Sequence, residues 1–246
     1  MNRRNFLACA VIAPTLSTNL MAEDNDVYLS PDEFMTVSSL NSRLKRLKRF
    51  VGFANFNLIS YHQALYYGRN YSRVGAFTQK EIGMMERLFD ENPNDYGFYG
   101  ERTCLNLDNK VARKDVEKIP YTGHYLFKGK SEEDYKKIVS DVGDSIILTS
   151  GVRNVVKQMS LYVNKIYNCG GNMSKATISI APPAYSYHTI SDFDVGRKGW
   201  GYKNFTADFA LTNEFAKMTK LDYIGMRYTM NNMDGVRFEP WHVEVI

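Results

Sequence analysis

The chain lacks a long apolar run and a strong net charge, and each absence narrows what the protein can be. The apolar stretch near its N-terminus runs from Phe6 to Ala13, well short of the roughly 20 residues that a membrane-spanning helix needs. The formal net charge is +4, and it falls to +2 if the first 22 residues are removed. That excess is too small to favour a nucleic-acid partner. No internal repeat or low-complexity tract is present.

Cysteine is also scarce, with 3 residues in the chain. Cys104 and Cys169 would be the only two left once an N-terminal signal is removed. In an oxidising compartment they could pair, but the sequence does not place their Cα atoms within bonding distance. Whether they pair stays open at this point.

The first 22 residues have the pattern of an export signal. Arg3 and Arg4 form a basic start, the apolar run follows, and small residues up to Ala22 offer a cleavage site. The stretch "RRNFL" also fits the twin-arginine pattern, in which an arginine pair precedes an apolar pair. A general secretory signal that carries two arginines is the alternative. Both interpretations predict a periplasmic or otherwise extracytoplasmic protein with no permanent membrane span after signal removal.

Residues 23–125 are predicted to be mainly helical. Apolar residues recur at near-helical spacing over residues 34–68, and Ser30 is placed to cap this helix. Its basic run "RLKRLKR" is interpreted as a solvated face, with contact to an anionic envelope surface as the alternative. The stretch "TQKEIGMMERLFDENP" predicts a further helix, in which Thr78 and Glu81 form a capping box.

Residues 126–246 mix strands and helices without regular alternation, which indicates an α+β fold. We expect a small mixed or antiparallel sheet with flanking helices, preceded by the N-terminal helical region. The predicted helices cover residues 130–143, 152–167 and 204–220, and the predicted strands cover residues 145–151, 176–181, 192–196, 223–229 and 236–245.

The chain has 4 histidines, and their neighbours separate them into two pairs. His62 lies in a helical stretch and His124 in a turn-like one, so both are interpreted as structural or solvated. His188 instead leads into "SDFDVG". Strand alternation there puts Asp192 and Asp194 on one face, within reach of a metal that a histidine also binds.

The C-terminal stretch "RFEPWHVEV" supplies the second histidine of this pair. With His188 and one aspartate, His242 gives two nitrogens and one oxygen, a set that suits one Zn²⁺ ion with a fourth position left for water. Glu239, three residues before His242, is then placed to take a proton from that water as the general base.

Three stretches together resemble the zinc D-alanyl-D-alanine carboxypeptidases of the M15 family, the VanY-like enzymes. They are "LTSGVRNVVKQ", "SYHTISDFDVG" and "EPWH", in the order that the family has them. The resemblance covers roughly residues 130–246, whereas residues 30–125 carry none of these motifs. It implies a zinc peptidase domain over residues 126–246.

Carried over position by position, the resemblance assigns a role to each matching residue. His188 and His242 become zinc ligands, and Glu239 becomes the general base. Arg153 would stabilise the developing oxyanion or orient the substrate carbonyl, in keeping with its fixed charge and bidentate geometry. The two remaining motif residues would bind substrate; they are Ser186 and Gln158.

The ligand spacing departs from the family pattern by one residue. The family has a glycine three residues and an aspartate seven residues after the first histidine, where this chain has Ser191 and Val195. Aligning "DVG" with the family's Asp-apolar-Gly ending makes Asp194 the third ligand, six residues after His188. Asp192 is the alternative.

The sequence therefore predicts an exported zinc peptidase that hydrolyses the peptide stem of bacterial peptidoglycan, with D-Ala–D-Ala carboxypeptidase activity as the first reaction to test. An L,D-carboxypeptidase or a cross-link endopeptidase of the same family is the nearest alternative. A non-catalytic cell-wall-binding relative is the alternative from another class. Retention of Glu239, Arg153 and both histidines argues against it, because binding alone requires no general base.

Overall fold

The computed structural model describes residues 25–246, so the predicted export signal over residues 1–22 lies outside the described residues. The helices are α1 (Pro31–Val51), α2 (Phe53–Phe56), α3 (Tyr61–Asn70), α4 (Gln79–Asp90), α5 (Lys130–Val142), α6 (Val155–Asn168), α7 (Met173–Thr177) and α8 (Asn213–Met218). The strands are β1 (Val116–Lys118), β2 (Tyr125–Phe127), β3 (Ile146–Ser150), β4 (Phe193–Arg197), β5 (Ile224–Met226) and β6 (His242–Val245). Short 3₁₀ turns are η1 (Pro93–Tyr96), η2 (Arg113–Asp115), η3 (Tyr187–Thr189), η4 (Gly201–Phe205) and η5 (Ala207–Leu211).

The long helix expected over residues 34–68 is divided into three. Ser30 caps α1 as predicted, and the Glu33 carboxylate accepts the backbone N–H of Ser30 in return, which completes a capping box. The helix ends at Gly52, whose φ of 84° is a conformation that favours glycine. A second capping box at Ser60 starts α3. The helical spacing of apolar residues continues across both breaks, so the sequence pattern alone did not predict them.

The predicted helix at Thr78 is confirmed as α4, with both bonds of its capping box present. The Glu81 carboxylate of this box is 1% exposed. It also accepts hydrogen bonds from Ser39 and Arg43 of α1, each at 2.6 Å. One buried carboxylate therefore caps α4 and joins it to α1.

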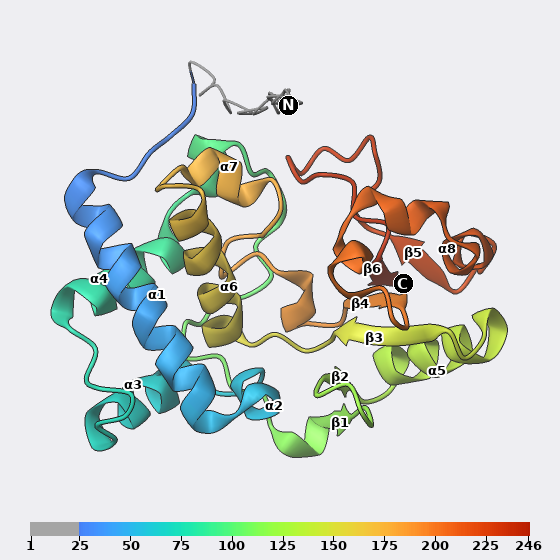
Figure 1. The fold of residues 1–246 in the computed structure, drawn as a ribbon, viewed down its shortest axis with the longest axis horizontal. Coiled ribbons are helices and arrows are strands. Elements are labelled where there is room, and N and C mark those ends of the chain that lie inside the picture. The colour runs from blue at the N-terminus through green and yellow to red at the C-terminus, as the bar shows by residue number, and fades with distance from the viewer. Residues whose placement is uncertain (1–24) are drawn as a thin grey trace, which may run out of the picture.

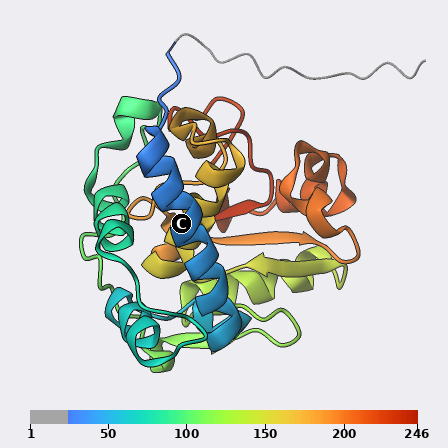
Figure 2. The ribbon, with the colours of Figure 1, turned by 60° about the vertical axis from the view of Figure 1, so that its left-hand side comes forward.

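The largest apolar cluster joins α1 to α6, although the two helices are far apart in the sequence. Leu40, Leu44 and Leu47 of α1 are completely buried there with Tyr162 and Val163 of α6. Figures 1 and 2 show α1 lying across this helical half, with the larger sheet on the other side of α6. The division into regions 23–125 and 126–246 stays a prediction, and this cluster contains residues from both.

The second half of the molecule is built on a four-stranded antiparallel sheet in the order β3-β4-β6-β5. Its core contains Phe193 and Val195 of β4 and Val243 of β6, packed with Ile138 of α5 and with Trp241. Strands β1 and β2 form a separate antiparallel pair. The predicted α+β class, with a preceding helical region, is confirmed.

Three element predictions are wrong in detail. Residues 176–181 form no strand, because Asn172 caps the short helix α7 and buries Met173 and Ala176 against the helical core. The helix expected over residues 204–220 is two 3₁₀ turns followed by α8. The strand expected from residue 236 begins only at His242, so Glu239 lies in the turn that precedes it.

Cys104 and Cys169 are both free thiols in the structure. Cys104 is buried in the helical core, and Cys169 ends α6. Within residues 25–246, no helix is both long and apolar enough to cross a membrane.

The helical core provides a direct stability test. We expect Leu44→Ala, which empties a completely buried position, to lower the free energy of unfolding by about 2–5 kcal/mol. The matched control is Leu105→Ala, because Leu105 is 86% exposed and should change little. Urea unfolding followed by circular dichroism measures both, and equal effects would contradict this account of the core.

Candidate metal centre

Three buried side chains bring one atom each to a common point. His188 lies in η3, Asp194 in β4 and His242 at the first position of β6. Oδ1 of Asp194 lies 3.2 Å from Nε2 of His188 and 3.3 Å from Nδ1 of His242. One candidate ligand atom from each residue lies within 4.8 Å of the other two. The structure thus brings together the three residues that the sequence put forward as ligands.

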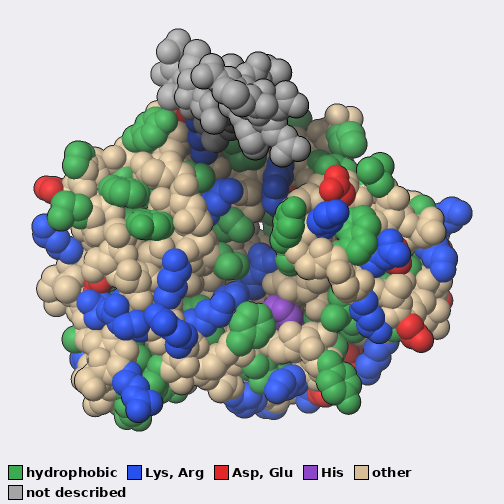
Figure 3. Space-filling model, in the orientation of Figure 1, with side chains coloured by type: hydrophobic (Ala, Val, Ile, Leu, Met, Phe, Trp, Pro, Cys, Tyr) green, Lys and Arg blue, Asp and Glu red, His purple; other side chains and the backbone are tan. Residues whose placement is uncertain are grey.

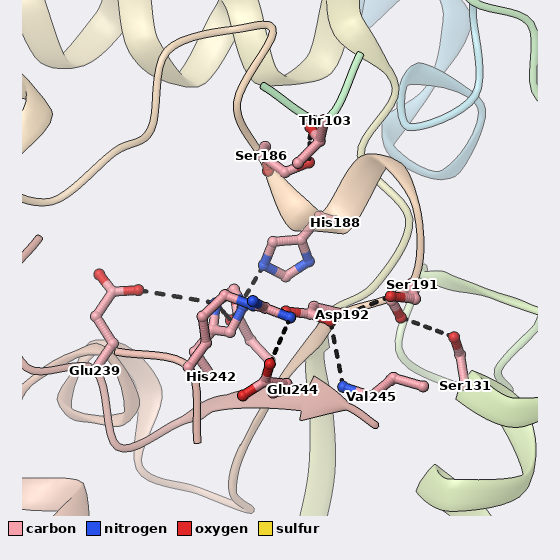
Figure 4. Close-up of polar contacts among 12 residues, drawn as sticks. Thr103, Ser131, Ser186, His188, Ser191, Asp192, Glu239, His242, Glu244 and Val245 are labelled. Atoms are coloured by element: carbon pink, nitrogen blue, oxygen red, sulfur yellow. Dashed lines mark hydrogen bonds and ion pairs between the residues drawn. The ribbon is translucent and has the colours of Figure 1, made fainter. Parts of the chain in front are cut away.

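Strand pairing is what aligns these groups. Asp194 stands directly opposite His242 across β4 and β6, and opposite Ser150 of β3 on its other side. The two imidazole rings meet edge to face, with centroids 4.9 Å apart, and Figure 4 shows His188 above His242. A slip of one residue in the pairing would turn Asp194 to the other face of the sheet.

In each histidine, the ring nitrogen that faces away from the common point contacts an oxygen that fixes the ring. Nδ1 of His188 lies 2.9 Å from the carbonyl oxygen of Gly151, and a carbonyl only accepts, so Nδ1 carries the proton. Nε2 of His242 lies 3.1 Å from Oδ2 of Asp192. These bonds leave Nε2 of His188 and Nδ1 of His242 for a ligand, which is the arrangement that supports metal-binding histidines in proteins.

The donor atoms fit a metal ion. Nε2 of His188 and Oδ1 of Asp194 are buried and have no hydrogen-bond partner among residues 25–246, although they lie 3.2 Å apart. Buried polar atoms are normally hydrogen-bonded, so an orphaned pair needs another explanation. Two imidazole nitrogens and a carboxylate oxygen are the donor set of catalytic zinc sites, which keep a fourth position open.

The electrostatics of the cluster also suit a cation. Burial and the nearby Arg153 guanidinium lower the pKa of His188 to about 4, so the ring is neutral at pH 7. Burial alone would raise the pKa of Asp194, but His188 and Arg153 hold it well below its usual value. Burial would likewise lower the pKa of His242, but the Asp192 and Asp194 carboxylates on either side of the ring raise it to about 9. A divalent ion would replace the proton that His242 holds between two carboxylates.

Asp192 supports His242 from the side opposite to Asp194. Its Oδ2 also lies 2.5 Å from Nε of Arg227, and its Oδ1 accepts the backbone N–H of Val245 at 3.3 Å. Burial would raise its pKa, but these partners, with His242 first, lower it to about 2. Asp192 was the alternative ligand in the sequence analysis. In the structure its carboxylate contacts Nε2 of His242, not the point where the three ligating atoms meet.

Glu239 approaches His242 from the side away from Asp192 (Figure 4). Its Oε2 lies 3.9 Å from Nδ1 of His242, and its Oε1 lies 3.6 Å from Nε of Arg237. Its backbone carbonyl accepts the N–H of His242 at 3.0 Å, which closes the turn before β6. Glu239 is 8% exposed, and burial raises its pKa to about 7. A carboxylate with such a pKa can both accept and return a proton near neutral pH.

Arg153 lies between β3 and α6 and is tied to the ligand cluster. Its Nη2 forms an ion pair with Oδ2 of Asp194, and its Nε donates to Oγ of Ser150 at 2.7 Å. Its backbone N–H donates to the carbonyl of His188 at 3.1 Å. Nη1 is the guanidinium nitrogen that these contacts leave for a substrate oxygen.

The two residues predicted to bind substrate lie in different surroundings. Ser186 is 3% exposed, and its carbonyl accepts a hydrogen bond from the Thr103 hydroxyl at 3.0 Å, beside His188 (Figure 4). Gln158 is 1% exposed, and its Nε2 donates to the carbonyl of Ala181 at 2.7 Å. Its Oε1 has no partner among the described residues. The substrate-binding role of both residues stays a prediction.

The sequence analysis missed a buried lysine close to Arg153. Lys157 is 6% exposed, and its ammonium lies over the rings of Phe53 and Phe56 at 5.2 and 6.0 Å. Burial, followed by the charge of Arg153, lowers its pKa to about 7. A lysine in an amphipathic helix is usually exposed, so the sequence held no signal for this position. His124, in edge contact with Phe53, is buried as well.

Figure 3 shows a hollow between the two halves of the molecule, with lysine or arginine side chains on its wall. A peptide with a free carboxylate would meet positive charge on entering this hollow.

Comparison with known proteins agrees with this placement. Residues 131–246 match the family model "VanY: D-alanyl-D-alanine carboxypeptidase". This part of the chain therefore resembles the VanY carboxypeptidases of the M15 type. No curated protein matches the chain.

Solved structures that match part of the chain include the following three. LdcB LD-carboxypeptidase, described for peptidoglycan recognition, is 21% identical over 53% of this chain and 63% of its own, with a TM-score of 0.44. VanYB in complex with D-alanine-D-alanine is 20% identical over 61% and 86%, with a TM-score of 0.46. The D,D-dipeptidase VanXYg in complex with a phosphinate analogue is 19% identical over 52% and 53%, with a TM-score of 0.44. The chain thus spans less than two thirds of the LdcB and VanXYg chains.

The support of His242 by Asp192 can be measured through metal affinity. We expect Asp192→Asn to weaken zinc binding about 10–100-fold, because the His242 ring loses its carboxylate partner. Glu244→Gln is the matched control, since Glu244 also pairs with Arg227, at 3.0 Å, but does not contact His242. Competition with a chromogenic chelator gives both affinities. An equal loss in the two variants would show that Asp192 acts through Arg227 alone.

Burial of Lys157 predicts a pH-dependent stability. Its pKa is about 7 in the folded chain against an ordinary value of 10.5. The unfolded chain therefore binds more protons between these values, and stability rises with pH across that window. We expect Lys157→Met to raise the Tm by about 2–4 °C near pH 6 and by less near pH 9. Lys165→Met, at a half-exposed position of the same helix, should change the Tm without this dependence on pH. Scanning fluorimetry at both pH values measures the two variants, and the same trend in both would contradict the prediction.

Proposed function

We propose that this protein is a zinc-dependent carboxypeptidase that removes a terminal D-amino acid from the peptide stem of bacterial peptidoglycan. The observation that carries the proposal is the convergence of His188 Nε2, Asp194 Oδ1 and His242 Nδ1, with the Glu239 carboxylate next to them. A peptide terminus that ends in D-Ala–D-Ala is the first substrate to test.

The residues around the centre provide what amide hydrolysis needs. A bound zinc ion supplies a Lewis acid that lowers the pKa of water and polarises a carbonyl. Glu239, buried and with a pKa of about 7, accepts the proton of the attacking water and passes it to the leaving amine. Arg153 offers positive charge where negative charge grows on the substrate oxygen. Asp192 keeps the Nδ1 side of His242 turned toward the centre.

The proposed reaction takes place outside the cytoplasm. Peptidoglycan lies beyond the cytoplasmic membrane, and the export signal predicted over residues 1–22, with its arginine pair, would bring the protein there. Twin-arginine export would also allow the chain to fold before translocation.

The proposal is tested with purified protein that begins after the predicted signal. We expect about one zinc ion per chain, and release of D-alanine from a D-Ala–D-Ala-ended stem peptide that stops with chelator and returns with zinc. Mass spectrometry of the products and metal analysis measure both. Release only from peptides with an L,D terminal bond, or only from cross-linked dimers, would overturn the D,D assignment. Absence of both zinc and cleavage would favour a cell-wall-binding protein.

The role of Glu239 is tested separately. Glu239→Gln should keep zinc and lower kcat about 10²–10⁴-fold, because the proton acceptor is lost. Glu244→Gln, a change of the same kind in β6, should retain activity. Full activity of Glu239→Gln would remove this residue from the mechanism.

A further inference from the structure

Three adjoining hollows form a groove across the helical half, and none of the residues of the candidate metal centre lines them. The first has a volume of about 570 Å³ and the second about 340 Å³, and they share Leu58, Gln63 and Val111 in their walls. The third, of about 500 Å³, shares Phe50 with the second. We call this continuous feature the helical groove. Three connected hollows suit a linear chain better than a single small molecule.

Aromatic rings lie along the helical groove. Tyr66 lines the first hollow and Tyr67 the second, and Phe50 lines the second and third. Tyr71 lines none of the hollows but packs on Phe50. Phe50 lies 5.8 Å from Tyr67 and 4.5 Å from Tyr71, and Tyr66 lies 5.8 Å from Tyr67, between ring centroids. Tyr66 and Tyr71 are 52% and 41% exposed. A contiguous group of exposed rings is unusual on a protein surface and marks a place where a ligand packs. The face of an aromatic ring carries partial negative charge, which suits the C–H groups of a sugar ring.

Hydrogen-bonding groups line the first hollow. Asp108 accepts the backbone N–H of His62 at 2.8 Å and pairs with Nδ1 of the same residue at 2.8 Å, which fixes both side chains. Ser60 and Gln63 lie in the same wall. Hydroxyl, amide and imidazole groups beside flat rings are the donors and acceptors that sugar hydroxyls need.

Positive charge lines the third hollow. Arg46, Arg49 and Arg73 form its wall with Phe50. Arg46 and Arg49 donate through Nε to backbone carbonyls only, at 3.1 and 3.4 Å, and no carboxylate within residues 25–246 pairs with any of the three. Figure 3 shows lysine and arginine side chains gathered over the C-terminal half of α1. Guanidinium groups without a carboxylate partner at one end of a groove favour a ligand that carries carboxylate or phosphate groups.

We propose that the helical groove binds a linear glycan strand with acidic substituents. The rings pack against the sugars, the first hollow accepts their hydroxyl groups, and the three arginines hold a carboxylate. Resting on the proposed function, the occupant is the glycan strand of the same wall polymer whose stem peptide the metal centre cuts. The helical half then holds the polymer while the hollow between the halves receives its peptide.

Co-sedimentation with purified peptidoglycan sacculi tests the groove without any catalytic step. We expect the double variant Tyr66→Ala, Tyr71→Ala to bind about tenfold more weakly than the native chain, because two packing surfaces are lost. The matched control is Tyr99→Ala, Tyr202→Ala, which removes two tyrosines that are 59% and 77% exposed elsewhere on the surface. Unchanged binding of the groove variant, or an equal loss in the control, would overturn the proposal.

The arginines and the identity of the occupant have their own tests. Arg49→Gln, Arg73→Gln should weaken sacculus binding and flatten its dependence on salt, because fewer charges attract the ligand. Soluble chitin oligosaccharides should compete with sacculi, since they carry the sugar rings alone. Competition by polyglutamate but not by oligosaccharide would show that the groove binds an acidic peptide, and would overturn the glycan assignment.

A paired activity assay separates the failure of this proposal from the failure of the proposed function. The groove variant should cleave a soluble, sugar-free stem peptide at the native rate and intact sacculi about tenfold more slowly. Equal rates on both substrates for native and variant protein would contradict the groove. If the native chain cleaves neither substrate, the catalytic proposal fails, and co-sedimentation still decides whether the groove binds glycan.

Discussion

The candidate centre depends on one stretch of antiparallel pairing, in which Asp194 of β4 stands opposite His242 of β6. This register brings a carboxylate to Nδ1 of His242, and it leaves Asp192, just before the strand, on Nε2 of the same ring. A single histidine is thereby oriented by two carboxylates with different tasks. His188 joins from a turn, where its ring Nδ1 donates to the carbonyl of Gly151 and its own carbonyl accepts the backbone N–H of Arg153.

The helical half of the molecule supports this arrangement. The Thr103 hydroxyl donates hydrogen bonds to the carbonyls of Ala184 and Ser186. Ser186 lies two residues before the candidate ligand His188, so these bonds fix the segment that leads to it. Asn154, completely buried next to Arg153, donates to the carbonyls of Leu58 and Ile59 at 3.1 Å each. A region with none of the family's motifs therefore positions segments that carry them. The same region forms the helical groove. One part of the molecule would therefore both support the candidate centre and bind the wall polymer.

The sequence predicted the α+β class and the identity of the converging residues, because the motifs around His188 and His242 are local and their order is specific. It did not predict the breaks at Gly52 and Ser60, because the apolar spacing continues across them. Residues 176–181 have strand propensity, yet packing against α6 makes their first part helical, which is a tertiary effect.

The roles of Asp192 and Asp194 show the same limit at the site itself. Alternation put both on one face, and that was sufficient to propose either as a ligand. Only the register with β6 shows which carboxylate reaches which nitrogen of His242. The sequence likewise does not show that Lys157 is buried, because its burial depends on Phe53 and Phe56, about 100 residues earlier in the chain.

The most direct test of the central claim is a crystal structure of the zinc-loaded protein with anomalous data collected at the zinc edge. The account predicts one anomalous peak, bonded to Nε2 of His188, Nδ1 of His242 and a carboxylate oxygen of Asp194 at about 2.0–2.2 Å. Asp192 should remain on Nε2 of His242 and outside the coordination sphere. A peak bonded to Asp192 in place of Asp194, or a zinc ion that lacks either histidine, would contradict it.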